Sequence, residues 1–336
     1  MARLLIVAPS WVGDAVMMQP MLRLLREVQP ECAIDVLAPA WCAPVIGRMP
    51  EVEALHANPF AHGQLVLAKR WRLARELALR GYQQALILPN SFKSALLPWF
   101  AGIRRRTGFL GEQRYGLVND RPAFAPQSLP RLVDRYAGLA LGRPPHAGET
   151  PQPRLLVDRE AQRASIERLG LALDRPVFAL CPGAEYGSAK RWPADHFATL
   201  ARMAVENGFV VWVLGSAKDQ AICAAIAGAA PRVIDLAGRT RLNEVVDLLA
   251  LACCVVSNDS GLMHLAAAVN VPLVALYGSS SPGYTPPLSD RARILRLELE
   301  CSPCFQRECP LGHLRCLKEI APEQVWSAAQ TSSALD

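Results

Sequence analysis

The segment RLLIVAPSWVGDAVMMQP (residues 3–20) decides the fold. Residues 3–8 form a short, continuous apolar run, which is typical of a buried strand in a parallel sheet. An amphipathic helix is predicted over residues 15–28, and Gly13 and Asp14 stand in the turn before it. Ligands of parallel α/β folds bind at the carboxyl ends of the strands, so Asp14 is a candidate functional residue. The local alternative is that Asp14 serves only as the N-cap of this helix.

The alternation of strand and helix continues along the chain. Apolar runs bounded by turn residues predict further strands at residues 33–38, 85–88, 105–109, 177–181, 209–214, 232–236, 253–257 and 273–278. Helical periodicity predicts helices at residues 71–80, 91–101, 193–207, 217–229, 241–252 and 260–269. Continuous apolar strands joined by helices indicate parallel sheets that are covered on both faces.

Proline and glycine concentrate in residues 143–156, which we interpret as a linker between two domains. We therefore expect an α/β protein with two Rossmann-like, doubly wound domains, residues 1–150 and 151–336, facing a central cleft. The last helix is placed either in the second domain or packed back on the first.

Composition and missing motifs exclude several classes of protein. The chain has 336 residues, of which 51% are hydrophobic and 20% charged, as in globular proteins. It contains no apolar run of the roughly 18 residues that span a membrane and no recognisable signal peptide, so we expect a cytoplasmic protein. The glycine fingerprint of dinucleotide-binding oxidoreductases, the P-loop and the basic motifs of nucleic-acid binding are also absent.

The net charge is +6, and arginines gather in a few places of the first half. They are Arg104, Arg105, Arg106, Arg114, Arg131 and Arg135. Any one of them is typical of a solvated surface. Together they favour an anionic partner, namely a phosphate, an acidic sugar or a membrane headgroup.

Four of the ten cysteines lie in the segment CSPCFQRECPLGHLRC (residues 301–316), which also holds His313. The first pair has the C-x2-C spacing of a zinc site, but the second pair lacks the spacing of a standard zinc ribbon. We favour unligated thiols in a surface segment and expect no metal. A structural metal and a local disulfide are the alternatives for Cys301, Cys304, Cys309 and Cys316.

Strand-end loops of the second domain carry residues suited to a nucleoside diphosphate. Residues 253–257 run into Asn-Asp-Ser-Gly, where Asp259, Ser260 and Gly261 open a helix whose free N–H groups attract phosphate. His264 follows one turn later on the same helix face. The alternatives are a capping role for Asp259 or Ser260 and a packing role for His264.

Three neighbouring loops extend this predicted site. Lys190, in CPGAEYGSAKRWP, is either a point charge for a phosphate or a solvated lysine. Gly215 and Ser216 allow a ligand to approach the backbone closely. Asp219 is a candidate ribose contact or a first-turn acid, and Thr240 is a candidate nucleoside contact or an N-cap.

The first domain offers polar groups for an acceptor at the ends of its strands. They lie beside Asp14 in the opening segment and in the loop LPNSFKSAL. We predict that they bind a polyhydroxyl or acidic acceptor. These acceptor candidates are Ser10, Gly13, Asn90, Ser91 and Lys93.

Taken together, the motifs resemble those of glycosyltransferase family 9, the lipopolysaccharide heptosyltransferases. The resemblance rests on PSWVGDAVMMQPML, LPNSFKSAL, RTGFLGEQRYGLVND, CPGAEYGSAKRWP, GSAKD and NDSGLMHLAAA. Each motif is weak alone, but the set is specific. It extends from residue 1 to about residue 296 and leaves the cysteine-rich segment unexplained.

The resemblance implies a GT-B fold and an inverting transfer of L-glycero-D-manno-heptose from ADP-heptose. The acceptor would be the first heptose of heptosyl-Kdo2-lipid A, at the cytoplasmic face of the inner membrane. By the same resemblance Asp14 is the catalytic base, and Lys190 binds the diphosphate. Asp259, Ser260 and Gly261 then hold the phosphates and sugar of the donor. No cofactor is expected to be required, and stimulation by Mg²⁺ stays open.

Two other hypotheses compete with the heptosyltransferase function. The first is a related transferase that uses another acceptor heptose or another nucleotide sugar. The second is a non-catalytic protein that binds nucleotide sugars through the same loops. Fold alone does not choose among them, and the acceptor hydroxyl and the oligomeric state stay open.

Overall fold

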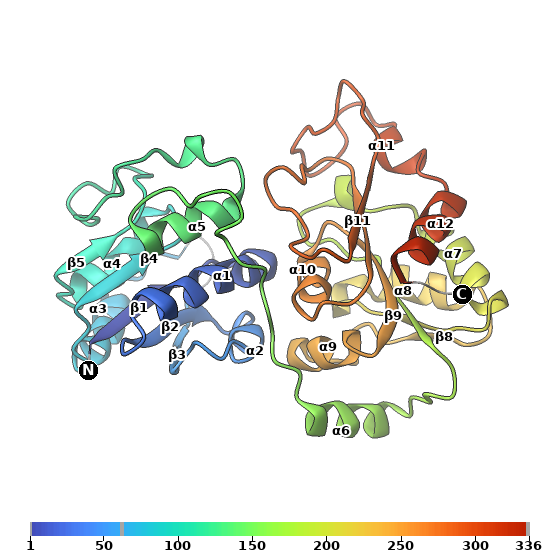
Figure 1. The fold of residues 1–336 in the computed structure, drawn as a ribbon, viewed down its shortest axis with the longest axis horizontal. Coiled ribbons are helices and arrows are strands. Elements are labelled where there is room, and N and C mark those ends of the chain that lie inside the picture. Colours follow the sequence, from blue (N-terminus) through green and yellow to red (C-terminus); the bar gives the residue numbers. More distant parts are fainter. Residues whose placement is uncertain (1, 61–63, 334–336) are drawn as a thin grey trace. The chain divides into compact units, whose positions relative to one another are not determined.

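The computed structural model describes residues 2–60 and 64–333 (Figure 1). Its contacts divide the chain into two compact units, Met1–Pro153 and Arg154–Asp336. The division falls inside the proline-rich stretch 143–156. Within the described residues, no helix has both the length and the apolar character needed to cross a bilayer.

Unit 1 is built on a five-stranded parallel sheet with the strand order β3-β2-β1-β4-β5. Its strands are β1 (Arg3–Val7), β2 (Ala33–Pro39), β3 (Ala54–Asn58), β4 (Gln84–Ile87) and β5 (Arg105–Thr107). Its helices are α1 (Val12–Val28), α2 (Ala43–Ile46), α3 (Leu67–Ala78), α4 (Phe92–Phe100) and α5 (Leu132–Leu141), with a short 3-10 turn at Pro126–Ser128.

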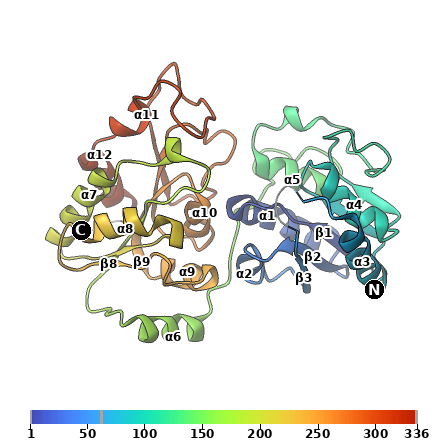
Figure 2. The same cartoon turned by 180° about the vertical axis from the view of Figure 1, so that it is seen from behind.

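Helices cover both faces of this sheet, which is why its central strands are apolar throughout. Leu5 and Val7 point to the face where α3 and α4 pack, together with Ala74 and Leu97 of those helices. On the other side α1 lies against α5, and Figure 2 shows the two side by side. A parallel sheet enclosed in this way leaves polar groups room only at the strand ends.

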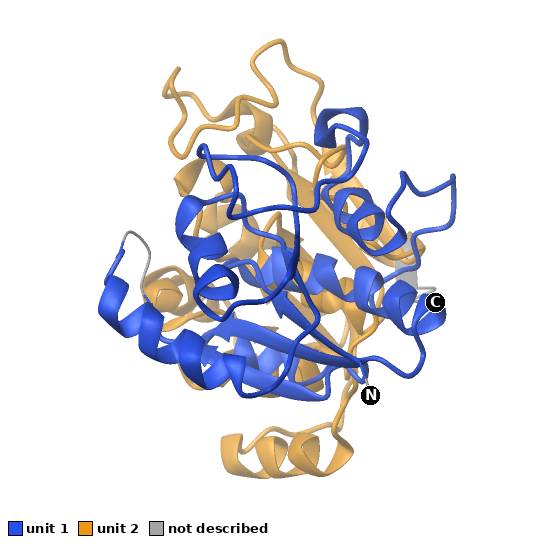
Figure 3. Cartoon of the chain, turned by 90° about the vertical axis from the view of Figure 1, so that its left-hand side faces the viewer, with its two compact units in different colours: residues 1–153 blue, residues 154–336 orange. Residues whose placement is uncertain are grey.

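Unit 2, orange in Figure 3, holds a six-stranded parallel sheet with the order β11-β10-β9-β6-β7-β8. Its strands are β6 (Val177–Cys181), β7 (Val210–Val213), β8 (Val233–Asp235), β9 (Ala252–Asn258), β10 (Leu273–Tyr277) and β11 (Ala292–Arg296). Its helices are α6 (Arg159–Leu169), α7 (Ala194–Glu206), α8 (Gln220–Ala227), α9 (Leu242–Leu249), α10 (Gly261–Ala268), α11 (Arg315–Lys318) and α12 (Pro322–Ser333), with 3-10 turns at Ser188–Lys190 and Ala217–Asp219. The two parallel sheets confirm the predicted α/β class.

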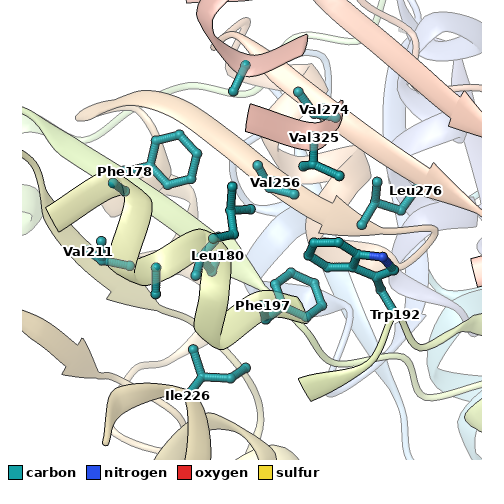
Figure 4. Packing of buried hydrophobic residues seen from close by; sticks show 14 of the residues in the cluster. Phe178, Leu180, Trp192, Phe197, Val211, Ile226, Val256, Val274, Leu276 and Val325 are labelled. Atoms are coloured by element: carbon teal, nitrogen blue, oxygen red, sulfur yellow. The ribbon is translucent and has the colours of Figure 1, made fainter. Parts of the chain in front are cut away.

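The core of unit 2 fills the space between this sheet and helices α7, α8 and α12 (Figure 4). Trp192 is fully buried there, packs edge-on against Phe197 with ring centroids 4.8 Å apart, and donates its indole N–H to Ile320 O at 2.9 Å. Val325 and Trp326 of α12 belong to the same core. Helix α12 is thus part of the core of unit 2.

The prediction omits several elements of both units. The strands β3 and β11 lie at sheet edges and are half-exposed, so they lack the continuous apolar run of a buried strand. Helix α5 follows the turn-rich residues 121–131, and α6 is mainly polar. A capping residue, Asp158, nevertheless starts α6 by accepting hydrogen bonds from the N–H groups of Glu160 (3.1 Å) and Ala161 (3.0 Å).

A buried polar network lies on the amino-terminal side of the sheet of unit 1. The carboxylate of Asp35, in β2, has no exposed surface. It accepts hydrogen bonds from Tyr82 Oη at 2.6 Å and from Arg3 Nη1 at 3.1 Å, and His56 Nε2 lies 3.3 Å away. Burial and the bond to Asp35 raise the pKa of Tyr82, so this phenol stays a donor. The network links β1, β2, β3 and the start of β4.

We expect Tyr82→Phe to lower the free energy of unfolding by about 1–2 kcal/mol, because a buried carboxylate loses a donor. Urea unfolding of the full chain measures the effect. Tyr115→Phe removes the same hydroxyl from a side chain that is 70% exposed and should change stability by less than about 0.5 kcal/mol. Equal effects of the two substitutions would show that the network contributes nothing.

Candidate functional site

The candidate donor site of unit 2 lies at the carboxyl ends of β6, β7, β9 and β10. These strands are neighbours in the sheet, so the loops that follow them are neighbours as well. The register pairs Cys181 with Ser257 and Leu276 with Asn258. The predicted residues Lys190, Gly215 and Asp259 are thereby brought to one edge of one sheet.

At the centre of this edge an ion pair joins two of the predicted residues. Lys190 Nζ lies 2.5 Å from Asp259 Oδ2, and the same oxygen accepts a hydrogen bond from Ser280 Oγ in the loop after β10. The side chains are only 17% and 5% exposed, so water screens the pair weakly. Lys190 is therefore not a solvated loop lysine. Its ammonium is held in one place by two neighbouring loops.

His264 lies on α10 behind this pair. Its side chain is buried, and burial lowers its pKa to about 4, although Asp259 acts in the opposite direction. The imidazole is therefore neutral at physiological pH. The predicted packing role and a neutral hydrogen-bonding role are both compatible with this position.

The N-terminus of α10 has no side-chain cap. Ser260 is the N-cap residue, but its side chain accepts no hydrogen bond from the first turn; its hydroxyl lies 3.3 Å from that of Ser257 instead. Gly261, the first helical residue, has no side chain to cover the turn. The capping alternative for Ser260 is thus not realised, and the first-turn N–H groups keep their capacity to bind an anion.

Asn258 is a site-forming residue that the sequence analysis missed. It is fully buried at the end of β9, donates Nδ2–H to Pro182 O at 2.7 Å, and accepts from Trp192 N–H at 3.0 Å. Its amide therefore spans both ends of the loop that carries Lys190. A polar residue that ends an otherwise apolar strand was the available signal.

Gly215, Ser216 and Asp219 form a tight turn after β7. The carboxylate of Asp219 accepts hydrogen bonds from the backbone N–H of Ser216 at 2.9 Å and from its hydroxyl at 2.7 Å. A Cβ on Gly183 would lie 2.6 Å from this carboxylate, so the glycine makes room for it. Asp219 thus takes the first-turn structural role that was its alternative to a ribose contact.

Thr240 does not cap α9, because the N-cap residue is Arg241. Among the described residues its buried hydroxyl has no hydrogen-bond partner, and the same holds for Ser279 in the loop after β10. An unpaired buried hydroxyl is costly, so both atoms are suited to meet a polar ligand group.

In unit 1, Asp14 lies in the first turn of α1, two residues after its start, and is half-buried. The N-cap is Trp11, whose side chain makes no capping bond, so the N-cap alternative for Asp14 is wrong. Gly13 stands in the same turn. The backbone oxygen of Ser10 accepts hydrogen bonds from Trp41 Nε1 at 2.7 Å and from Cys42 Sγ at 3.5 Å, which fixes the turn on the loop after β2.

The loop with Asn90, Ser91 and Lys93 is organised by a buried cation. Arg114 is fully buried, and its guanidinium donates to Pro89 O at 2.6 Å and to Asn90 Oδ1 at 3.2 Å. Burial lowers its pKa to about 10. Asn90 itself is exposed, Ser91 is the half-buried N-cap residue of α4, and Lys93 is half-buried in its first turn.

The idea that the arginines form one anion-binding surface therefore needs correction. Arg114 is interior, and Arg106 donates to the carbonyl groups of Leu117 (2.7 Å) and Ile103 (2.6 Å). Three of the remaining four arginines are also engaged: Arg105 pairs with Asp120, Arg131 with Asp134, and Arg135 donates to Leu129 O, whereas Arg104 is exposed. Arg106, Arg114 and Arg135 thus hold loops of irregular backbone, where carbonyl groups need donors.

The four cysteines of the segment 301–316 are free thiols around one cavity of about 20 Å³. Its wall also includes Ala189 and Ser279 from the donor loops. Backbone N–H groups, that of Leu314 foremost, lower the pKa of the Cys309 thiol. Across residues 2–60 and 64–333, no three His, Cys, Asp or Glu side chains are arranged as ligands of a metal ion.

Comparisons with known proteins agree with this geometry. The model of glycosyltransferase family 9 (heptosyltransferase) matches residues 70–315. The chain is 43% identical to lipopolysaccharide heptosyltransferase 2 of Escherichia coli K12 over 334 residues, or 96% of each protein. It is 45% identical to lipooligosaccharide heptosyltransferase 2 of Haemophilus influenzae, over 95% of this chain and 96% of that protein.

Among solved structures, that of the E. coli ADP-heptose lipopolysaccharide heptosyltransferase II matches with a TM-score of 0.87 and 40% identity. The match covers 99% of this chain and 98% of the other. A second E. coli heptosyltransferase, solved with ADP, shares the fold with a TM-score of 0.75 at 21% identity. These matches confirm the GT-B class. The chain belongs to glycosyltransferase family 9, the heptosyltransferases, and is a transferase.

Proposed function

We propose that the protein transfers L-glycero-D-manno-heptose from ADP-heptose to the first heptose of heptosyl-Kdo2-lipid A. The observation that carries the proposal is the buried Lys190–Asp259 pair beside the open N-terminus of α10. A fixed ammonium and free first-turn N–H groups suit a diphosphate. The names of the relatives support a heptose as the transferred sugar, with lipopolysaccharide named for the E. coli protein and lipooligosaccharide for that of H. influenzae.

Inverting transfer at the anomeric carbon is a single displacement. The acceptor oxygen forms the new bond to this carbon, the bond to the ADP oxygen breaks, and ADP leaves with the electron pair. We assign Asp14 as the base that takes the proton of the acceptor hydroxyl. Lys190 and the N–H groups of Ser260 and Gly261 stabilise the charge that develops on the departing diphosphate.

The polar residues of unit 1 are proposed to hold the acceptor sugar. Asn90 is exposed, and Arg114 fixes its amide through Oδ1, which leaves the Nδ2–H donors for a hydroxyl group. Ser91 follows as the N-cap residue of α4, and Lys93 lies in its first turn. Lys93 suits an acidic group of the acceptor, such as a Kdo carboxylate.

We further propose that helix α3 contacts the membrane that carries the lipid acceptor. The helix has three exposed cations, Lys69, Arg72 and Arg75, against a single acid, Glu76. Trp71 is 55% exposed beside them. An exposed aromatic side chain among cations is typical of a surface that binds anionic lipid headgroups. This helix replaces the arginines 104–106 as the favoured surface.

The central test is release of ADP from ADP-heptose in the presence of heptosyl-Kdo2-lipid A. Activity should require this acceptor and fall sharply with Kdo2-lipid A or with other nucleotide sugars. Donor binding without ADP release would instead identify a non-catalytic nucleotide-sugar binding protein.

Asp14→Asn should lower kcat by about 100-fold or more, because the amide cannot accept the proton. The KM for ADP-heptose should stay within about twofold of the wild-type value. Asp195→Asn is the matched control, since Asp195 is also an acid in the first turn of a helix, α7, and is exposed. Near-normal turnover of a folded Asp14→Asn variant excludes this carboxylate as the base.

Lys190→Ala should weaken ADP binding by about 10- to 100-fold, because it removes the cation and leaves Asp259 to repel the phosphates. Isothermal titration calorimetry measures the affinity. Lys218→Ala is the control: Lys218 lies in a neighbouring loop, is exposed and pairs with Glu185. Similar losses in both variants would contradict a specific role for Lys190.

The double charge reversal Arg72→Glu/Arg75→Glu should weaken binding to phosphatidylglycerol vesicles by about tenfold or more. Sedimentation with vesicles measures binding, and activity on a delipidated acceptor should be retained. Arg163→Glu/Arg202→Glu reverses two exposed helical arginines of unit 2 and should have little effect. A loss of vesicle binding that is equal in both double variants rules out a specific role of α3.

A further inference from the structure

The cysteine-rich segment, residues 301–316, packs directly against both donor loops of unit 2. Towards the loop after β10, Phe305 N–H donates to Ser279 O at 2.6 Å, and Ser302 Oγ donates to Gly278 O at 2.7 Å. Ser279 is the neighbour of Ser280, which binds Asp259. The segment therefore supports the turn that holds the centre of the phosphate site.

The same segment supports the loop that carries Lys190. Ala189 N–H donates to Arg307 O at 3.0 Å, and Tyr186 Oη donates to Phe305 O at 2.8 Å. The two backbones approach so closely that a Cβ on Gly187 would lie 2.2 Å from Arg307 O. Gly187 thus permits a contact that no other residue would allow.

Two cations share the ring of Tyr186. Lys190 Nζ lies 5.2 Å from the ring centroid, and the guanidinium carbon of Arg307 lies 5.3 Å from it. Cations placed over a tyrosine ring are attracted by its π-electrons. The ring therefore contacts both cations and ties the side chain of Arg307 to the loop that carries Lys190.

Arg307 differs from the other cations of these loops in its charge balance. Each of the others faces an acid: Lys190 faces Asp259, Arg191 faces Asp219, and Lys218 faces Glu185. Within the described chain, Arg307 is exposed and makes no ion pair with a carboxylate. With His264 neutral, Lys190 and Asp259 together carry no net charge. A diphosphate needs positive charge that this pair does not supply.

We infer that Arg307, held by Tyr186, is a second cation for the donor diphosphate and a specificity residue of the donor site. The inference rests on the proposed function, because it assumes that ADP-heptose binds beside Lys190. The cysteine-rich segment then acts as a wall of the donor site. Its four thiols line a cavity whose wall also includes Ala189 and Ser279.

Calorimetry with ADP and with adenosine tests the inference. Arg307→Gln should weaken ADP binding by about tenfold and leave adenosine binding within about twofold, because only the phosphates lose a partner. The tenfold loss should shrink at high salt. A structural role of Arg307 would instead weaken both ligands. Arg293→Gln, at an exposed position of β11, is the control and should bind both ligands normally.

Tyr186→Phe and Tyr186→Ala separate the ring from the hydroxyl. The phenylalanine variant keeps the aromatic ring that contacts Arg307, so it should bind ADP nearly as well as the wild type. The alanine variant lacks the ring, so its affinity for ADP should fall to that of Arg307→Gln. If the wild type binds ADP and Arg307→Gln binds it equally well, the inference fails and the proposed function stands. If the wild type binds neither ADP nor ADP-heptose, the proposed function itself fails.

Discussion

The parallel pairing of β6 with β9 is the constraint on which the donor site depends. Its register sets Cys181 beside Ser257, so the loop after β6 starts where β9 ends. Asn258 can then bond to Pro182 and to Trp192 at the two ends of that loop. Lys190, two residues before Trp192, is thereby held beside Asp259, which precedes the N-cap residue of α10. Without this register neither the ion pair with Asp259 nor the phosphate site would form.

Much of this arrangement could be predicted from the sequence, because buried parallel strands are continuous apolar runs. Those runs located the central strands and the loops behind them, including Lys190 and Asp259. The edge strands β3 and β11 were not predicted, because about half of their side chains face solvent. The N-cap role considered for Asp14 was wrong because α1 starts two residues earlier, at Val12. Helix boundaries of this kind depend on backbone angles that a sequence pattern does not specify.

Single charged residues were the least predictable part. Arg106 and Arg114 look like surface cations in the sequence, yet both donate to backbone carbonyl groups of loops. A guanidinium has five donors in a rigid fork, so one arginine can satisfy a whole turn of irregular backbone. An isolated arginine has no periodicity that would reveal this use. Net charge is accordingly a weak indicator of what unit 1 binds. A local cluster of exposed cations, such as that of α3, is a better indicator.

The proposed donor site likewise contains charged groups that have a partner inside the protein and groups that have none. This difference explains how a neutral ion pair can form part of a binding site for an anion. Asp259 cancels the charge of Lys190, but together with Ser280 it also holds the ammonium in one position. Binding a diphosphate then costs little side-chain entropy, and recognition depends on geometry more than on net charge. Attraction of the anion has to come from groups that lack an internal partner, namely the open helix end at Ser260 and an exposed cation. In the proposed donor site, Lys190 and Asp259 orient the phosphates, whereas the helix end at Ser260 and Arg307 of the cysteine-rich segment attract them.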